Sequence, residues 1–385
     1  MLFTIEAIAR EGVMSESYFA EGRERAIALG NRGSLRYDDN GGVHPDILSA
    51  YWKYGFYVLE GLVGAEELAS LREDFAQVIE RAPAGPGAKV DRHGNPALDA
   101  NLARPGFQFA KPLSDPMGGT DVGNGRYQVK MAELTPDEDA PETVLLQING
   151  NLQYMDSALR LYGHPELLKV AEAINGADFT PFTDAIWVKP AGLGAAVSWH
   201  QDGMTLWDSP DLDAGTHGFN FMAQLYPTTP RNALWIVPET HNIGKIDIQQ
   251  CVADNDGSDK LPDGVPLLCD AGDVAVCSRQ MLHCSFPNDS EDPRVTFVFG
   301  FHRRASVQGA EGRNFRNNSK IRYDDERIHE RSRVISLAID ARQQKYPDGP
   351  RYVYQPLVGE EDENRWNEET RQTVLKNYNL NDLGI

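Results

Sequence analysis

The chain has 385 residues, enough to bury a large core as one elaborated domain or two small ones. Its composition is that of an ordinary globular protein, with 41% hydrophobic residues, and no run of about 18 apolar residues predicts a membrane span. A net charge of −20 disfavours nucleic acid and other polyanions as partners.

The N-terminal residues lack a basic start followed by a long apolar stretch, so they do not resemble a signal peptide. None of the four cysteines forms a Cys-x-x-Cys pair; they are Cys251, Cys269, Cys277 and Cys284. Together these features predict reduced thiols and a cytoplasmic protein.

The first half of the chain contains few regular patterns. Residues 1–45 show little periodicity, and residues 51–63 are typical of a helix end, a glycine break and an apolar strand. Apolar residues at helical spacing predict an amphipathic helix over 65–82. Residues 83–145 are rich in glycine, proline and aspartate, and a loop of this length indicates either a functional lid or a mobile segment.

Helices are expected over 147–162 and 165–175, the second with Pro165 in its first turn and Gly176 just beyond its end. From about residue 183 the pattern changes to short strands separated by turn residues. The predicted strands are Asp184–Lys189, Ala196–His200, Gly218–Tyr226, Leu234–Val237, Val265–Cys269, Val274–Cys277 and Arg294–Phe301. The tail is expected to be helical over 322–346 and 362–379.

These elements predict a mainly β fold with helices: a jelly roll, or cupin-like double-stranded β-helix, decorated by N- and C-terminal helices. We expect a single catalytic domain over 1–385. It would comprise an N-terminal helical region (1–182) with the lid-like loop 83–145, a jelly-roll core (183–304) and a C-terminal helical extension (305–385).

A metal site is indicated by His200 and Asp202, which are two residues apart in an extended segment and so can face one ion. A third ligand, His283, follows the strand-like segment that ends near Val276. Two imidazoles and one carboxylate leave open positions on an octahedral ion, which suits iron(II) that binds a bidentate ligand and O₂. A lone His-x-Asp triplet is common by chance, so the prediction rests on His200, Asp202 and His283 occurring together in this order.

Arg294 opens the last apolar strand. A buried arginine on a strand is costly unless it pairs with an anion, and its planar fork matches a carboxylate. A dicarboxylate such as 2-oxoglutarate would chelate the iron through its 2-oxo acid end and reach Arg294 with its other carboxylate.

With these motifs in place, most of the chain resembles the phytanoyl-CoA dioxygenase family of iron(II)/2-oxoglutarate oxygenases. The segments that carry the resemblance are 54–62 followed by Glu66-Glu67-Leu68, the metal motif His200-Gln201-Asp202, residues 232–241, Ala271-Gly272-Asp273-Val274, His283 and Arg294. Asn232 and Glu239 depart from the family's usual glycines, which affects the shape of a turn and no ligand. The loop 83–145 has no clear match and is expected to determine substrate specificity.

The resemblance implies that the chain hydroxylates a C–H bond of a small molecule, with formation of succinate and CO₂ from 2-oxoglutarate and O₂. Desaturation, cyclisation and epimerisation use the same chemistry, and the sequence does not choose among them. Asp202 stands where related halogenases carry a small residue, so oxygenation is expected. The resemblance also implies cosubstrate contacts from Phe221, Ser285 and Thr296, although packing within the strands is the alternative for each.

Four further residues are candidates for substrate contact: Met204, Trp207, Trp187 and Lys189. Ordinary core packing is the alternative for the residues after the metal motif, and solvent exposure is the alternative for Lys189. Two other function classes stay open: a cupin-like metal enzyme that does not use 2-oxoglutarate, and a non-catalytic binding protein on the same fold. The sequence does not indicate the oligomeric state.

Overall fold

The computed structural model describes residues 2–102, 105–203, 218–313 and 320–380. Within these ranges two sheets form a jelly roll. The larger sheet has the strand order β1-β2-β10-β7-β12-β5-β4-β3, and the smaller has the order β6-β11-β8-β9. Neighbouring strands are antiparallel except β1 and β2, which are parallel. The mainly β fold with helices predicted from the sequence is confirmed.

The strands of the larger sheet are β1 (Arg32–Gly33), β2 (Phe56–Leu59), β3 (Phe107–Ala110), β4 (Val144–Asn149), β5 (Phe179–Lys189), β7 (Phe219–Gln224), β10 (Val274–Ser278) and β12 (Arg294–Arg303). Those of the smaller sheet are β6 (Val197–His200), β8 (Trp235–Ile236), β9 (Val265–Pro266) and β11 (His283–Ser285). In a separate two-stranded sheet, β13 (Glu311–Arg313) pairs antiparallel with β14 (Lys320–Arg322).

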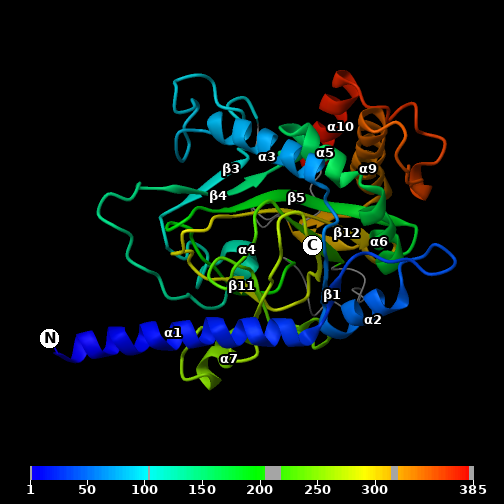
Figure 1. Cartoon of the computed structure of the whole chain (residues 1–385). Coiled ribbons are helices and arrows are strands. Elements are labelled where there is room, and N and C mark those ends of the chain that lie inside the picture. The colour runs from blue at the N-terminus through cyan, green and yellow to red at the C-terminus, as the bar shows by residue number, and fades with distance from the viewer. Residues whose placement is uncertain (1, 103–104, 204–217, 314–319, 381–385) are drawn as a thin grey trace.

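The helices are α1 (Leu2–Leu29), α2 (Pro45–Tyr54), α3 (Ala65–Glu80), α4 (Val122–Gly125), α5 (Asp156–Tyr162), α6 (Pro165–Asn175), α7 (Ile248–Asp254), α8 (Arg304–Val307), α9 (Asp325–Lys345) and α10 (Glu368–Leu380). Figure 1 shows α3, α5, α6, α9 and α10 on one side of the larger sheet, with α1 and α7 on the opposite side of the molecule. None of the helices in the described ranges combines the length and apolarity needed to cross a membrane.

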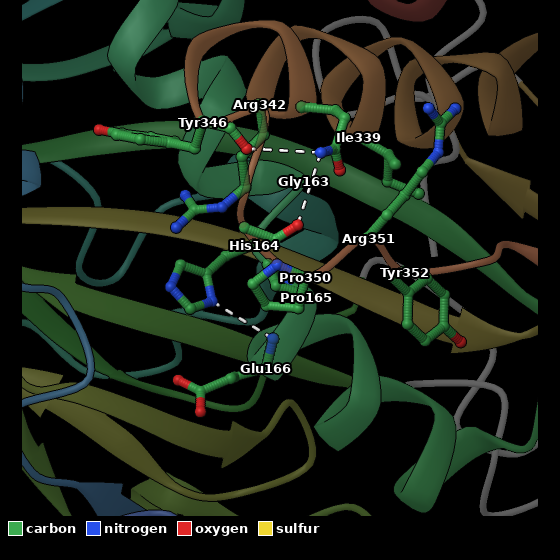
Figure 2. A pocket seen from close by; sticks show the side chains of 12 residues that line it. Gly163, His164, Pro165, Glu166, Ile339, Arg342, Tyr346, Pro350, Arg351 and Tyr352 are labelled. Atoms are coloured by element: carbon green, nitrogen blue, oxygen red, sulfur yellow. Dashed lines mark hydrogen bonds between the residues drawn. The ribbon is translucent and has the colours of Figure 1, made fainter.

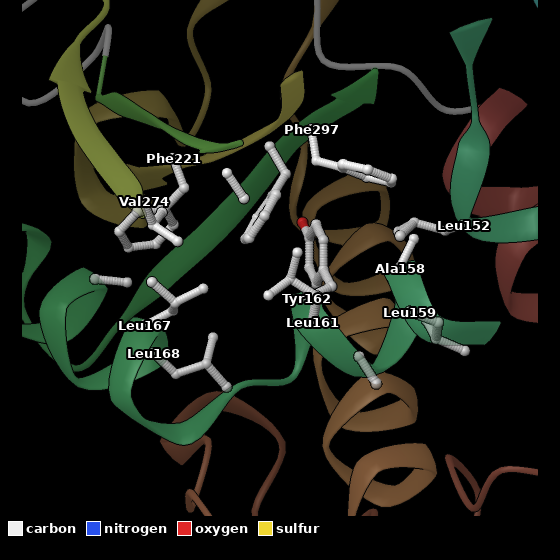
Figure 3. Close-up of a cluster of buried hydrophobic side chains, with 14 of the residues drawn as sticks. Leu152, Ala158, Leu159, Leu161, Tyr162, Leu167, Leu168, Phe221, Val274 and Phe297 are labelled. Atoms are coloured by element: carbon white, nitrogen blue, oxygen red, sulfur yellow. The ribbon is translucent and has the colours of Figure 1, made fainter. Parts of the chain in front are cut away.

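Strand alternation divides the larger sheet into two faces. On β12, Val295, Phe297 and Phe299 belong to the largest apolar cluster, which fills the space between the sheet and the covering helices (Figure 3). The intervening Arg294 and Thr296 point the other way and line a cavity. One face of each strand therefore stabilises the fold, and the other builds the site.

Helix α6 begins at Pro165 and ends at Asn175, as predicted, and α3 ends two residues earlier than expected. The predicted helix over 147–162 is wrong in its first part, because Val144–Asn149 forms β4. Buried and half-buried residues alternate along β4, which is the period of a strand.

The N-terminal region also differs from the prediction. Residues before 183 supply β1 to β4, so they extend the larger sheet in addition to forming helices. Helix α1 was not predicted because few of its described side chains are buried. It packs on the smaller sheet through Tyr18, whose ring stacks on Trp235 at 4.6 Å, and through Gly22, where a Cβ would lie 2.3 Å from that tryptophan.

Candidate metal and cosubstrate site

The structure brings the three predicted metal ligands together. His200 ends β6, His283 begins β11, and the two are paired in register with ring centroids 4.1 Å apart. Asp202 follows β6, and donor atoms of all three side chains lie within 4.8 Å of one another. This set of two imidazoles and one carboxylate suits iron(II) and leaves coordination positions for other ligands.

Main-chain carbonyl groups fix the orientation of both imidazoles. Nδ1 of His200 lies 2.8 Å from the carbonyl oxygen of Ser198, and Nδ1 of His283 lies 2.9 Å from that of Met281. In each ring Nδ1 therefore donates a proton, which leaves the lone pair of Nε2 for a metal. Burial lowers the pKa of both histidines, so the neutral forms that bind metals are favoured.

Asp202 is held as a carboxylate. Burial by itself raises the pKa of Asp202, but the nearby His283, Arg126 and Arg279 together lower it more, so the pKa lies below its ordinary value. Of the two arginines Arg126 lies closer, with Nη1 3.2 Å from Oδ1 of Asp202.

Arg126 and Tyr127 were not singled out from the sequence, and both come from the loop 83–145. The ring of Tyr127 lies 4.6 Å from the ring of His200, and the guanidinium group of Arg126 covers the tyrosine at 4.8 Å. Part of the predicted lid-like loop thus contacts two of the three predicted metal ligands. Arg126 and Tyr127 directly follow the four-residue helix α4, which is too short to show a periodic pattern. No local sequence pattern therefore indicates their place beside the metal ligands.

Residues 113–134, which we call the strap, are held by hydrogen bonds within the segment and to the rest of the protein. The buried carboxylate of Asp115 accepts hydrogen bonds from the backbone N–H groups of Met117, Gly118 and Met131. The side chain of Gln128 donates to the carbonyl of Ile246 and accepts from the N–H of Ile248. The strap is therefore an organised part of the site.

The residues predicted to hold the far end of 2-oxoglutarate line the same cavity as the three ligands. Arg294 is only 3% exposed, and its Nη1 donates to the carbonyl of Asn232 at 3.0 Å. Burial lowers the pKa of Arg294 to about 10, so the guanidinium group stays charged at neutral pH. Ser285 and Thr296 line this cavity too.

Two buried polar atoms in this part of the cavity lack a hydrogen bond within the described residues: Nε of Arg294 and Oγ of Ser285. Buried groups left without partners cost free energy unless a ligand or water satisfies them. Thr296 differs, since its hydroxyl donates to Oε1 of Gln224 at 2.8 Å. The residues present therefore fit iron(II) at one end of the cavity and a carboxylate at the other.

The predicted cosubstrate contact of Phe221 is corrected by the structure. Phe221 is fully buried on the helix-covered face of β7, where its ring packs 4.9 Å from Phe219 and 5.5 Å from Phe299 (Figure 3). Its neighbours Asn220 and Met222 point into the cavity instead, because adjacent strand residues face opposite sides.

Of the proposed substrate contacts, Trp187 lines the cavity. Lys189 is buried, so exposure, the alternative considered for it, is wrong. Its ammonium group donates to the carbonyl oxygens of Ala195 and Phe286, and Lys189 is not among the residues that line the cavity. Met204 and Trp207 lie outside the described residues.

Three other residues at the site were missed: Asn220, Gln224 and Arg279. Asn220 and Gln224 alternate with apolar residues on β7, and a polar set facing inward on a buried strand is a signal that could have identified them. Arg279 follows β10, with Nε 3.9 Å from Oδ2 of Asp202 and its guanidinium group 3.5 Å from the centre of the Phe182 ring.

A second cavity lies between the start of α6 and the end of α9, away from the metal ligands (Figure 2). Both arginines that line it have a carboxylate partner: Arg342 pairs with Glu67, and Arg351 lies 3.8 Å from Asp340. None of its described lining side chains has a buried polar atom without a hydrogen bond.

Comparison with known proteins gives one family match and a set of similar folds. Residues 51–296 match the family model described as Phytanoyl-CoA dioxygenase (PhyH). No curated protein matches the chain.

Similar solved structures include EctD from S. alaskensis with 2-oxoglutarate and 5-hydroxyectoine, which has 18% identity and a TM-score of 0.47, with 72% of this chain and 82% of that chain covered. AviO1 from Streptomyces viridochromogenes Tue57 has 20% identity and a TM-score of 0.44, with coverage of 66% and 93%. EvdMO1 has 21% identity and a TM-score of 0.44, with coverage of 66% and 48%, so this chain spans about half the length of EvdMO1.

Proposed function

This chain belongs to the phytanoyl-CoA dioxygenase (PhyH) family, and we propose that it is an iron(II)- and 2-oxoglutarate-dependent oxygenase that hydroxylates a C–H bond of a small molecule. The products formed from 2-oxoglutarate would be succinate and CO₂. One observation carries the proposal: His200, Asp202 and His283 share a single cavity with Arg294 and Ser285, and within the described residues Nε of Arg294 and Oγ of Ser285 are buried without a hydrogen bond.

The metal would be held by His200, Asp202 and His283, with Arg294 and Ser285 binding the far carboxylate of 2-oxoglutarate. When bound, iron(II) and 2-oxoglutarate together supply the activation of O₂ that an unreactive C–H bond requires. The protein's part is to fix the cosubstrate by its charged end, to present neutral imidazoles, and to keep water from the site.

Part of the cavity lining is apolar. Trp187, Met222 and Val298 line it together with the charged and polar groups. Among the described lining residues, Arg294 and Ser285 suit the distal carboxylate and the three metal ligands suit the 2-oxo acid end, which favours one orientation of the cosubstrate.

The substrate would approach the ligand end, where the strap places Tyr127 against His200. The strap is therefore our candidate for the element that determines which small molecule is accepted. A reducing compartment such as the cytoplasm would suit four free thiols.

The test is iron-dependent release of succinate from 2-oxoglutarate. Wild type supplied with iron(II), O₂ and 2-oxoglutarate should form succinate, and a true substrate should accelerate its release. His283→Ala should abolish it. Cys284→Ala is the matched control, because Cys284 follows His283 directly but packs in an apolar cluster on the other side of the strand.

Succinate release that does not need iron, or no release with any candidate substrate despite bound iron, would contradict the proposal. The first result would show that the reaction does not require the metal. The second would favour a cupin-like enzyme without 2-oxoglutarate or a binding protein.

A further inference from the structure

The two oxygens of Asp202 are in different surroundings. Oδ1 lies on the ligand side, 3.6 Å from Nε2 of His200, and is also the oxygen that Arg126 contacts. Oδ2 accepts a hydrogen bond from Nδ2 of Asn220 at 3.0 Å. Both oxygens have a protein donor, but Oδ1 is the one that lies close to Nε2 of His200, so Oδ1 is the oxygen placed to meet a metal beside the two imidazoles.

From this geometry we infer that Asn220 is a positioning residue: its side-chain amide orients Asp202 so that the carboxylate binds the metal through one oxygen only. The inference rests on the proposed function, because it concerns the metal site of that reaction. A carboxylate that turned to bind through both oxygens would occupy a position that 2-oxoglutarate and O₂ require.

The position of Asn220 on β7 explains why it serves this role. It pairs with Gly300 on β12 and Cys277 on β10, so its backbone is held by strands on both sides. It is only 4% exposed and lines the cavity. A side chain anchored on a central strand holds its partner more rigidly than one on a loop.

The amide also has one favoured orientation. A Cβ added at Gly300 would lie 2.5 Å from Oδ1 of Asn220, so the missing side chain of the glycine provides the space for that oxygen. The opposite orientation of the amide would place Oδ1 against the carboxylate of Asp202, where the two acceptors repel each other. The observed orientation leaves Oδ1 without a hydrogen bond among the described residues. The free-energy cost of that buried acceptor is offset by the hydrogen bond to the charged Asp202.

The experiment uses cobalt(II) alone as the probe, titrated into the full chain under argon and followed by its visible d–d absorption, which depends on coordination number. Asn220→Leu keeps a similar side-chain volume but removes the donor. We expect it to weaken cobalt(II) binding by about 10- to 100-fold and to change the absorption spectrum. Asn220→Ser retains a shorter donor and should give an intermediate affinity.

Asn31→Ala is the matched control. Asn31 is equally buried and donates to the carbonyl of Phe56 at 3.1 Å, but it lies outside the cavity. The control should lose thermal stability as the Asn220 variants do, while keeping the wild-type affinity and spectrum. This separates a lost positioning bond from a general loss of stability.

The inference is overturned if Asn220→Leu binds cobalt(II) as tightly as wild type with an unchanged spectrum, or if the leucine and serine variants are equally weakened. Should Asn220→Leu fail to fold, Asn220→Ser decides the question by the same comparison with wild type. In either case wild type would still bind the metal and respond to 2-oxoglutarate, and the proposed function would stand. Failure of wild type itself to bind cobalt(II) would contradict both the role of Asn220 and the proposed function.

Discussion

Arg294 is a buried cation whose Nη1 donates to a neutral carbonyl, that of Asn232, so its position in the cavity favours an anionic ligand. A hydrogen bond with a charged group contributes about 1.5–3 kcal/mol. We therefore expect Arg294→Gln to raise the Kd for 2-oxoglutarate by about 10- to 100-fold, measured by titration of the metal-loaded protein. The control is Arg303→Gln, at the exposed end of the same strand. Equal affinities in wild type and Arg294→Gln would refute this role.

His164 links stability to pH. Its Nδ1 accepts a hydrogen bond from the N–H of Glu166 at the start of α6 (Figure 2), which requires the neutral ring. Burial, helped by the charge of Arg342, lowers the pKa of His164 to about 3. The unfolded chain has the ordinary value of about 6.5 and binds the proton first, so stability falls as the pH drops from about 6.5 toward 3.

The variant His164→Asn keeps an acceptor at the helix start but cannot titrate. Between pH 6 and pH 4 its free energy of unfolding should fall less steeply than that of wild type, by up to about 1.4 kcal/mol per pH unit. Urea unfolding of both proteins at several pH values measures the difference. Parallel curves would show that His164 is not the group responsible.

At the scale of elements, three backbone N–H groups of the strap depend on one side chain, that of Asp115. Asp115→Ala would leave the N–H groups of Met117, Gly118 and Met131 without their acceptor, at about 1–3 kcal/mol for each group that stays buried. Amide hydrogen exchange over 113–134 should then accelerate strongly, while exchange in the larger sheet changes little. Asp137→Ala, an exposed acidic residue just beyond the strap, is the control. Unchanged exchange in the strap would mean that other contacts hold it.

Elements with a strong local pattern were predictable, and those fixed by tertiary contacts were not. Helix α6 has a proline at its start, a glycine at its end and helical periodicity between them, so its bounds follow from the sequence. Helix α1 buries few described side chains and gives little periodicity. The strap brings Arg126 to Asp202 through contacts with residues far away in the chain, which no local pattern encodes.

The same distinction applies within the site. The ligands His200, Asp202 and His283 could be proposed because they follow predicted strands at a spacing that places them on one face. The prediction for Phe221 assigned the wrong face of β7 to the cavity. A shift of one residue along a strand reverses the direction of every side chain. Met222 and Asn220 face the cavity instead.

At the scale of the whole molecule, the net charge of −20 repels the dianion 2-oxoglutarate before it reaches Arg294. Salt shortens the Debye length from about 30 Å at 0.01 M to about 8 Å at 0.15 M. The KM for 2-oxoglutarate should therefore fall several-fold over this range, whereas the KM for uncharged O₂ should not change. A KM for 2-oxoglutarate that rises with salt would show that local positive charge dominates its approach.

We propose that one cavity holds iron(II) and 2-oxoglutarate together. The most direct measurement is the visible metal-to-ligand charge-transfer absorption of the oxygen-free protein with both added. Wild type should show this band, His200→Ala should lack it, and Arg294→Ala should require a higher concentration of 2-oxoglutarate to reach it. Iron-loaded wild type that shows no such band at saturating 2-oxoglutarate would contradict the account.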